Sequence, residues 1–533
     1  MRPNQTLGAH NAEAPKTIAI LGAGFSGLCV AIKLKQAGFD SFTLYEKSSK
    51  LGGTWLDNTY PGAECDVPSH LYSFSFELNP NWSKRFSNCY EIRAYLEHCA
   101  TKYDIYQHIE FNTEITHADF DENKGKWSLT RADGQRLTQD VFISALGQLN
   151  KPKYPNIPGL DSFKGTLFHS SRWDHDFKLE GKSVAVIGTG ASAIQFIPEI
   201  AKQVKQLDVY QRSPNWIVPK PDREYSDAEH RHFNRYPALI RLYRRLLYWQ
   251  FELSFMAFKK DSWLGKRFVK AAETIMGQHI TDPALKQKLT PNYQIGCKRV
   301  LISNDYYPAM QRDNVALITN TVTKIDAHNV YSGDGTKRAV DAIILGTGFE
   351  ATDFLSPLQI KGKNHQSLNQ AWKDGAEAYL GITLTGFPNF FMLYGPNTNL
   401  GHNSIIVMIE TQANYIVQCI KTLNEKNLKY LDVRYDVQQR HNQNLQQDLS
   451  KRVWASDCSS WYKTETGKIT NNWPNTTVNY WWRTRRPNWL DYHAVPQDKN
   501  ANVHNSQPLG LGPKADLESQ PTSKPEQKSI NLS

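Results

Sequence analysis

The sequence predicts an α/β fold with two Rossmann-like dinucleotide-binding domains and a helical insertion in the second of them. Two observations carry this prediction. Two short apolar runs, residues 17–21 and 183–187, each lead straight into a glycine-rich turn and then into a helical pattern. With 533 residues, the chain is also too long for a single hydrophobic core, so several domains are expected.

The first glycine-rich turn, Gly22-Ala-Gly24-Phe-Ser-Gly27, has the residues that hold a pyrophosphate. Gly22 permits the tight turn, Gly24 lets the backbone approach the phosphates, and Gly27 lets the following helix pack closely on the strand. The N-terminus of that helix faces the phosphates. Glu46 ends the next expected strand, 19 residues after Gly27, where its carboxylate can accept hydrogen bonds from ribose hydroxyls.

The second turn, Gly188-Thr-Gly190-Ala-Ser-Ala193, predicts a second dinucleotide site. Alanine at its third position loosens the fit between helix and strand slightly. The next strand ends in Arg212 rather than in an acid, and a guanidinium can bind a 2′-phosphate where a carboxylate would repel it. The second cofactor is therefore predicted to be NADPH rather than NADH. The expected contacts of this turn are Gly188, Gly190, Ser192 and Ala193.

The composition indicates a globular protein with a formal net charge of +10 at pH 7. An excess of positive charge favours anionic partners, which include nucleic acids, acidic lipids and the phosphates of NADPH. No Lys- or Arg-rich run of the kind that binds nucleic acid is present, so nucleic acid is not an expected partner. Residues 1–15 are polar and contain no apolar signal core.

The seven cysteines form no C-x-x-C pair, and their number is odd. This pattern indicates neither a zinc site nor a disulfide scaffold, and no metal site is expected. Such cysteines fit a reducing compartment, so the expected location is cytoplasmic. The missing C-x-x-C also excludes a disulfide reductase, which would share both glycine-rich turns.

Residues 226–290 interrupt the alternation of strands and helices with a helical pattern that carries 12 Lys or Arg against 6 Asp or Glu. The apolar run 238–258 raises the question of a membrane span. Arg241, Arg244, Arg245 and Glu252 argue against one, because charges are costly at a bilayer centre. A helical insertion in the NADPH domain is expected, and peripheral contact with a membrane surface is a less favoured alternative.

The segment between the two turns, residues 163–174, has the form F-x-G-x-x-x-H-x-x-x-W-D. It resembles the fingerprint of the type I Baeyer–Villiger monooxygenases, which use FAD and NADPH to insert an oxygen atom beside a carbonyl. The resemblance implies that His169 links the two domains conformationally rather than acting as a general base. The alternative is a linker in which His169 and Trp173 only pack.

Other segments are similar to the same family and imply further site residues. The segment around Gly53, Thr54 and Trp55 is similar to the one that lies along FAD, which identifies the first dinucleotide as FAD. Asp66 matches an acid near the flavin that orients the active-site arginine. Residues 390–397 resemble a flavin-facing loop, and its expected FAD contacts are Gly395, Pro396 and Asn397.

The resemblance also assigns the nicotinamide side of the site. Arg299 falls on the family's catalytic arginine, while Ser213 and Lys298 match positions that contact the 2′-phosphate. Trp461 falls in a segment that resembles the mobile active-site loop. Residues 472–474 and 480–482 depart from the better-known ketone oxidisers, which leaves the substrate open.

The implied function is that of an FAD-dependent, NADPH-consuming Baeyer–Villiger monooxygenase. It inserts one oxygen atom from O₂ next to a ketone carbonyl to give an ester or lactone, through a flavin C4a-peroxide stabilised by Arg299. Arg299 stays charged at any working pH, and Asp66 can hold its donor fork in place. The alternatives are a flavin-containing monooxygenase that oxygenates N or S, and a non-catalytic nucleotide-binding redox sensor. The identity of the ketone and the oligomeric state are left open.

These patterns divide the chain into five parts, of which the last is rich in Pro, Ser, Asn and Lys without periodicity. They are a disordered N-terminus (1–15), a first part of the FAD domain (16–150), the NADPH domain with its insertion at about 226–290 (151–340), a second part of the FAD domain with the active-site loop (341–495), and a disordered tail (496–533).

Overall fold

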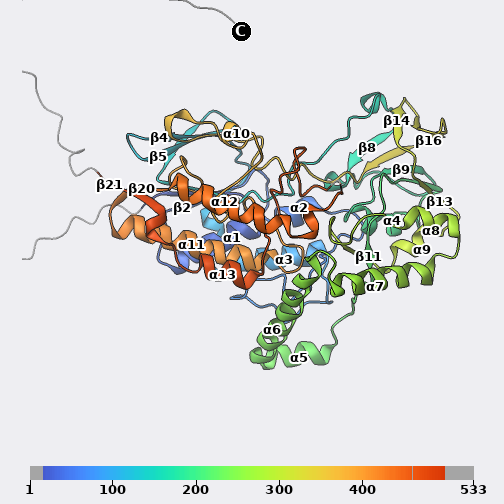
Figure 1. The fold of residues 1–533 in the computed structure, drawn as a ribbon, viewed down its shortest axis with the longest axis horizontal. Helices are drawn as coiled ribbons and strands as arrows, with labels where there is room; N and C mark the ends of the chain where they lie inside the picture. The colour runs from blue at the N-terminus through green and yellow to red at the C-terminus, as the bar shows by residue number, and fades with distance from the viewer. Residues whose placement is uncertain (1–15, 459, 498–533) are drawn as a thin grey trace, which may run out of the picture. The chain divides into compact units, whose positions relative to one another are not determined.

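The computed structural model describes residues 16–458 and 460–497 and contains two five-stranded, all-parallel sheets (Figure 1). The first has the strand order β19-β7-β1-β2-β3. Ile18 and Ile20 of β1 pack with the helices α1 and α11, whereas Ala19 and Leu21 pack against the antiparallel sheet of β4 and β5. Strand β1 is therefore buried on both faces and reads as a continuous apolar run. The bounds are β1 (Ile18–Leu21), β2 (Phe42–Tyr45), β3 (Ile109–Glu110), β7 (Val141–Ser144), β19 (Phe390–Met392), α1 (Phe25–Gln36) and α11 (Ile405–Glu425).

The second sheet has the order β13-β10-β9-β17-β8 and repeats the same construction. Val184 and Val186 of β9 pack with α4 and α9, and Ala185 packs with the antiparallel sheet β14-β15-β16 on the other face. The bounds are β8 (Thr166–His169), β9 (Ser183–Ile187), β10 (Gln206–Tyr210), β13 (Val315–Ile318), β17 (Ala342–Leu345), α4 (Ala193–Ile200), α9 (Tyr306–Met310), β14 (Val322–Ile325), β15 (Asn329–Ser332) and β16 (Lys337–Ala339).

Strand β17 corrects one sequence-based assignment. The apolar run 342–345 was predicted to return the chain to the FAD domain. Instead, β17 pairs in parallel with β9 and with β8, so it belongs to the second sheet. The chain returns to the first sheet later, at β19, which pairs with β7. The predicted boundary at residue 341 is therefore too early.

Two segments join the parallel sheets, and they are paired with each other. One follows β7 and the other follows β17. Pro152 and Phe349 form an antiparallel bridge. The N–H of Lys153 donates to the carbonyl of Gly348 at 2.8 Å, and the N–H of Glu350 donates to the carbonyl of Lys151 at 3.0 Å. The crossover between the two folds is thus a short two-stranded link rather than two independent loops.

The remaining elements cover the two sheets. Between β2 and β7, the chain forms the helix α3 and the antiparallel strands β4 to β6. The predicted disordered segment 1–15 and nearly all of the predicted tail lie outside the described residues, although Pro496 still belongs to a strand. The bounds are α2 (Thr54–Asp57), α3 (Cys89–Lys102), β4 (Ile115–Asp121), β5 (Lys126–Arg131), β6 (Arg136–Gln139), β11 (Ile217–Val218), β12 (Leu301–Ile302), β18 (Gln359–Lys361), α10 (Leu368–Ala371), β20 (Leu428–Val433), α12 (Tyr435–Ser450), α13 (Thr477–Thr484) and β21 (Tyr492–Pro496).

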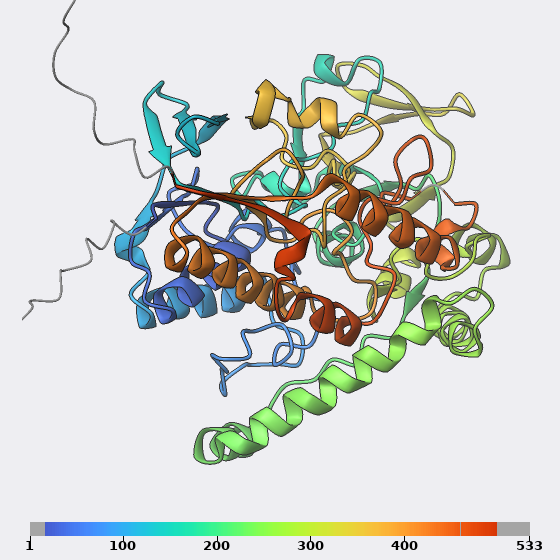
Figure 2. The same ribbon diagram turned by 60° about the vertical axis from the view of Figure 1, so that its left-hand side comes forward.

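The insertion is helical, as predicted. Ser226 begins its first helix with a capping box in which Glu229 returns the hydrogen bond, and Pro237 stands at the first position of the second helix. Helices α5 and α6 project from the rest of the unit as a hairpin (Figures 1 and 2). Within the described residues, no helix is long and apolar enough to cross a membrane. The bounds are α5 (Asp227–Arg235), α6 (Pro237–Leu253), a 3₁₀ turn at Ser254–Phe258, α7 (Trp263–His279) and α8 (Pro283–Leu289).

Candidate active site

Both glycine-rich turns open into one cavity of about 1780 Å³. Pockets for a single small ligand usually measure about 300–1,000 Å³, so this one has room for two dinucleotides. Its wall contains most of the residues that the sequence singled out. They are Gly22, Gly24, Glu46, Gly53, Thr54, Trp55, Asp66, Gly188, Gly190, Ser192, Arg212, Ser213, Lys298, Arg299 and Trp461.

The first turn is built for close packing and for an open phosphate side. Gly22 has φ +100°, a left-handed conformation that favours glycine. A Cβ on Gly27 would lie 1.9 Å from the carbonyl oxygen of Gly22, so α1 can approach the turn only with glycine there. Gly27 therefore supports the turn from inside and does not line the cavity.

Glu46 stands at the end of β2, as predicted, and its buried carboxylate fixes the turn. One oxygen accepts from the N–H of Ala23 at 2.8 Å, and the other accepts from the N–H of Ser48 at 2.9 Å. A carboxylate oxygen has two lone pairs, so these bonds leave acceptor capacity on the cavity side.

Two cationic side chains, Arg212 and Lys298, line the cavity on the side of the second glycine-rich turn. Lys298 donates from Nζ to Oγ of Ser213 at 2.7 Å, and burial followed by the charge of Arg212 lowers the pKa of Lys298. Among the described residues, neither Arg212 nor Lys298 forms an ion pair with a carboxylate. Two neighbouring cations without a carboxylate make a site for an anion such as a phosphate. Ala193, by contrast, does not line the cavity. It packs against Gly346: a Cβ built on Gly346 would lie 3.1 Å from the Cβ of Ala193.

Arg299 and Asp66, 233 residues apart in the sequence, meet on the cavity wall. Nε and Nη2 of Arg299 both donate to the same carboxylate oxygen of Asp66, at 2.9 and 2.5 Å. The side chains are 32 and 28 % exposed. The charge of Asp66 raises the pKa of Arg299, so the guanidinium stays charged. Because Asp66 occupies one edge of the guanidinium, Nη1 is left for other partners.

Two tyrosines that the sequence did not single out as site residues lie beside this pair. Burial raises the pKa of Tyr462 to about 12 and also raises that of Tyr394, so both remain neutral phenols near Arg299. Tyr394 donates its hydroxyl to Oδ1 of Asn399 at 2.7 Å. A single tyrosine in a loop gives a weak signal in one sequence, which is why these two were missed.

Three predicted FAD contacts lie in the loop that follows Tyr394, and their contact with FAD stays a prediction. Gly395, Pro396 and Asn397 do not line the cavity, whereas Tyr394 and Leu400 on either side of them do. The amide of Asn397 donates to the carbonyls of Ile469 and Asn472, at 2.9 and 3.2 Å. This loop supports the wall from behind.

His169 also lies behind the wall. It is fully buried at the end of β8 and does not line the cavity or contact Arg299. Its Nε2 lies 3.0 Å from the carbonyl oxygen of Gly348, and its Nδ1 accepts from the N–H of Ser171 at 3.1 Å. The imidazole therefore carries its proton on Nε2 and holds one of the two segments that join the sheets. This position fits the predicted link between domains.

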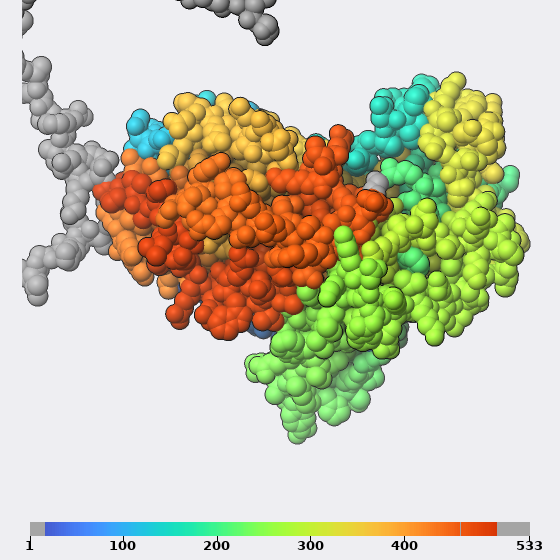
Figure 3. Space-filling view, viewed as in Figure 1, coloured from blue at the N-terminus to red at the C-terminus, as the bar shows by residue number. Residues whose placement is uncertain are grey.

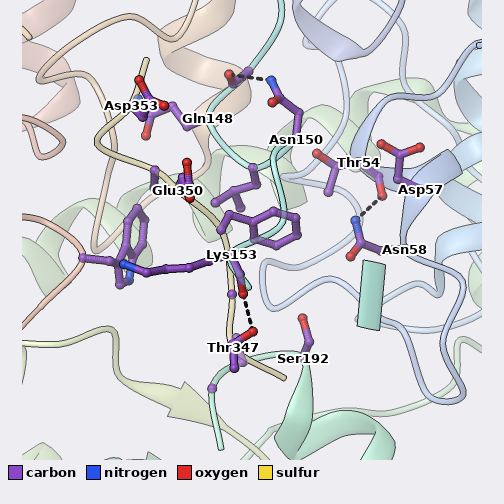
Figure 4. Close-up of a pocket in the computed structure, with 18 of the residues that line it drawn as sticks. Thr54, Asp57, Asn58, Gln148, Asn150, Lys153, Ser192, Thr347, Glu350 and Asp353 are labelled. Carbon is purple, nitrogen blue, oxygen red and sulfur yellow. Dashed lines mark hydrogen bonds between the residues drawn. The ribbon is translucent and has the colours of Figure 1, made fainter. Parts of the chain in front are cut away.

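The two joining segments also supply polar side chains to the cavity (Figure 4). Gln148 and Lys153 come from one segment, and Glu350 and Asp353 from the other; together with Thr54 of α2, they line the cavity. The hydroxyl of Thr347 donates to the carbonyl of Lys153 at 2.5 Å, which ties the two segments together. The sequence offered no motif for these residues.

One disulfide joins two parts of the site. Cys297, which directly precedes Lys298 and Arg299, is bonded to Cys458 in the loop that contains Trp461. The cysteine pattern indicated no disulfide scaffold, and the structure contains this single bond among the seven cysteines. Two cysteines 161 residues apart carry no spacing signal. The other five are free and buried.

The fold and the site together define a class. Two Rossmann-type sheets with glycine-rich turns, one shared cavity and a paired arginine between them are the construction of a flavin- and nicotinamide-dependent oxidoreductase. A family model described as flavin-binding monooxygenase-like matches residues 15–452. The chain belongs to this family, and within it to the Baeyer–Villiger monooxygenases, as its relatives show.

A Baeyer–Villiger monooxygenase of Pseudomonas aeruginosa is 45 % identical over 480 residues, covering 90 % of this chain and 91 % of that one. One of Streptomyces coelicolor is 43 % identical over 482 residues, with 90 and 92 % covered. Among solved structures, OTEMO in complex with FAD and NADP has a TM-score of 0.82 at 28 % identity, covering 91 % of this chain and all of that one. A steroid monooxygenase bound to NADP has a TM-score of 0.80 at 27 % identity, with the same coverage.

Proposed function

We propose that this chain is an FAD-dependent, NADPH-consuming Baeyer–Villiger monooxygenase that inserts one oxygen atom from O₂ beside a ketone carbonyl to give an ester or lactone. The observation that carries the proposal is the Arg299–Asp66 pair on the wall of a cavity shared by both glycine-rich turns. Arg212 and Lys298, which form no ion pair with a carboxylate in the described part of the chain, fit the 2′-phosphate of NADPH. The FAD and NADP of the OTEMO complex occupy a protein of the same fold.

When bound, NADPH supplies a hydride and FAD carries the electrons to O₂. The chain's own residues then provide charge and position. Arg299 places a permanent positive charge where negative charge develops on the ketone oxygen, in a partly dry site where such a charge is most effective. Asp66 orients the guanidinium through Nε and Nη2. Tyr394 and Tyr462 stay neutral, so they add no charge that would compete with Arg299.

A cytoplasmic location belongs to the same proposal. It rests on the five cysteines that are free thiols, and it implies that the Cys297–Cys458 bond is open to reduction in that compartment. The small-molecule partners that the reaction requires are a ketone and O₂. Fractionation of cells followed by activity measurement tests the location.

The experiment is a conversion assay with purified, yellow, FAD-loaded protein. A panel of linear, cyclic and aryl ketones is incubated with NADPH under ¹⁸O₂, and products are analysed by mass spectrometry. The proposal predicts ketone-dependent NADPH consumption and an ester that has gained one ¹⁸O atom. Oxygenation of sulfides or amines with no ester from any ketone would instead identify an N- or S-oxygenating flavin monooxygenase. Bound FAD with no substrate-dependent NADPH consumption would identify a redox sensor.

A further inference from the structure

Helix α6 presents an unusual apolar stripe on its outer face. The stripe consists of Leu239, Leu242, Leu246, Trp249 and Leu253, whose exposed fractions are 44, 53, 61, 53 and 59 %. The spacing of three, four, three and four residues puts all five on one side of the helix. Large contiguous apolar patches are rare on proteins that work alone in water, and they mark contact surfaces.

The inner face of α6 is already fully engaged. Ile240 and Leu247 are buried there. Nη1 of Arg244 donates to the carbonyls of His70 and Leu71, at 2.7 and 3.0 Å. The helix is therefore held firmly in one orientation, and its stripe faces away from the part of the unit to which it is attached.

A buried carboxylate fixes the C-terminal end of α6 in the same way. Glu252 accepts from the hydroxyl of Thr477 at 2.7 Å, from the amide of Asn403 at 2.8 Å and from the N–H of Val478 at 3.1 Å. Hydrogen bonds from His402, Thr477, Asn403 and Val478 together lower its pKa to about 2, although burial, the largest single influence, acts the other way. The charge of Glu252 is therefore buried and adds no negative charge to the outer surface of α6.

The exposed charges of α6 and of its immediate flanks have one sign, and the nearest exposed carboxylates along the chain are Asp227 at the start of α5 and Asp261. Between residues 231 and 260, Glu252 is the only carboxylate and it is buried, whereas every exposed charge is basic. Arg241 and Arg245 flank the stripe one residue before Leu242 and Leu246, and neither forms an ion pair among the described residues. The exposed basic residues are Arg231, Arg235, Arg241, Arg245, Lys259 and Lys260.

This charge pattern indicates which kind of partner the outer face of α6 can bind. A second copy of the same face would bring arginines against arginines, with no exposed carboxylate between them to offset the repulsion. An anionic lipid surface has the complementary charge and also accepts apolar side chains between its headgroups. The hairpin of α5 and α6 protrudes from the surface of the unit (Figures 2 and 3), so its outer face can reach a flat surface.

We propose that the outer face of α6 binds the surface of an anionic lipid bilayer. The five apolar side chains of the stripe enter the headgroup region, and Arg241 and Arg245 contact lipid phosphates. The contact is peripheral, because no helix among the described residues can cross a bilayer. The inference does not depend on the reaction proposed above, since none of these residues lines the cavity.

Flotation of the purified, full-length, FAD-loaded protein with lipid vesicles tests the proposal. The protein should float with vesicles of phosphatidylcholine and phosphatidylglycerol in equal parts, and much less with phosphatidylcholine alone. Added salt should weaken the binding, because it screens the attraction. A basic side chain at an anionic surface contributes about fivefold to binding, so the double variant Arg241→Gln/Arg245→Gln should bind roughly 30-fold more weakly. The double variant Leu242→Gln/Leu246→Gln should bind more than about tenfold more weakly, because two apolar side chains are lost from the contact.

The matched controls are exposed residues on other elements. Leu490→Gln replaces a leucine that is 78 % exposed, and Arg440→Gln/Lys451→Gln removes two cations at or next to α12. Both should bind vesicles as the wild type does, and all variants should keep the FAD content of the wild type. The proposal is overturned if the wild type does not float with anionic vesicles. It is also overturned if the α6 variants bind like the controls, or if sedimentation shows a dimer that only the α6 variants dissociate.

Discussion

At the residue scale, the cavity holds two kinds of positive charge. Arg299 is paired with Asp66, whose carboxylate fixes its direction and raises its pKa. Arg212 and Lys298 lie without a carboxylate partner among the described residues, and burial together with Arg212 lowers the pKa of Lys298. A paired arginine is suited to positioning charge, and unpaired cations are suited to taking up an anion. Substitution of Arg299 should therefore affect a different measurement from substitution of Arg212 or Lys298.

Arg212→Ala should raise the Michaelis constant for NADPH far more than that for NADH. A charged hydrogen bond to a phosphate contributes roughly 1.5–3 kcal/mol, so the NADPH value should rise on the order of tenfold to a hundredfold. Steady-state kinetics with both cofactors gives the answer, with the surface variant Arg440→Ala as the control. Equal weakening for both cofactors would mean that Arg212 does not read the 2′-phosphate.

His169 should make the protein sensitive to acid. Burial lowers its pKa to about 4, against about 6.5 in an unfolded chain. As the pH falls below about 6.5, the unfolded state takes up a proton that the folded state refuses, so stability is lost between about pH 6.5 and about pH 4. The loss reaches about 1.4 kcal/mol per pH unit for one group. His169→Gln should show a flatter decline of its urea midpoint with acid, and curves parallel to the wild type would contradict this account.

At the element scale, the sequence was most informative where a local rule decides the structure. A buried strand, a glycine-rich turn and a helix follow from nearest neighbours along the chain, and both such units are present. The strand β17 shows where this reasoning stops. Residues 342–345 are apolar and precede a glycine, as a strand of either parallel sheet would. Which sheet it joins is a matter of tertiary pairing, which periodicity does not encode.

The paired segments that join the sheets should control oxygenation rather than cofactor binding. His169→Ala removes the hydrogen bond to the carbonyl of Gly348 and leaves the residues of both glycine-rich turns in place. We expect a folded, FAD-loaded variant that oxygenates slowly, because residues at a link between domains act on closure more than on chemistry. Absorbance of bound FAD and single-turnover rates measure the two effects separately. Loss of FAD during purification would show that His169 only packs.

The disulfide connects the active-site loop to the segment that carries Arg299. In denatured, unreduced protein, five thiols should react with Ellman's reagent, and seven should react after reduction. Cys458→Ser should leave six reactive thiols in the unreduced protein, since Cys297 is released. Seven thiols in the unreduced wild type would contradict the bond between Cys297 and Cys458.

At the scale of the whole molecule, the cavity exists because two separate folds face each other. The first sheet provides Gly22 and Glu46, the second provides Gly188 and Arg212, and residues outside both sheets bring Asp66 and Arg299 together. The sequence identified these residues through local patterns and family likeness. It did not identify Tyr394 and Tyr462, Gln148 and Lys153, or the disulfide, because each depends on segments that are far apart in the chain.

We propose that the fixed charge of Arg299, which lies between the two cofactor sites, makes the chain a ketone oxygenase. Arg299→Ala leaves both glycine-rich turns intact, so FAD should stay bound and NADPH should still be consumed. Ester formation should fall by about 10²–10³, the usual effect of removing one donor that stabilises developing negative charge. Arg299→Lys should recover little, because an ammonium lacks the planar donor fork that Asp66 holds.

The measurement is the ratio of ester formed to hydrogen peroxide released per NADPH consumed, in the wild type, in Arg299→Ala and in Arg299→Lys. Ester should dominate in the wild type, and hydrogen peroxide should replace it as the main product in both variants while the protein remains yellow. A wild-type ratio in Arg299→Ala would contradict the proposal, and would make Arg299 a structural partner of Asp66.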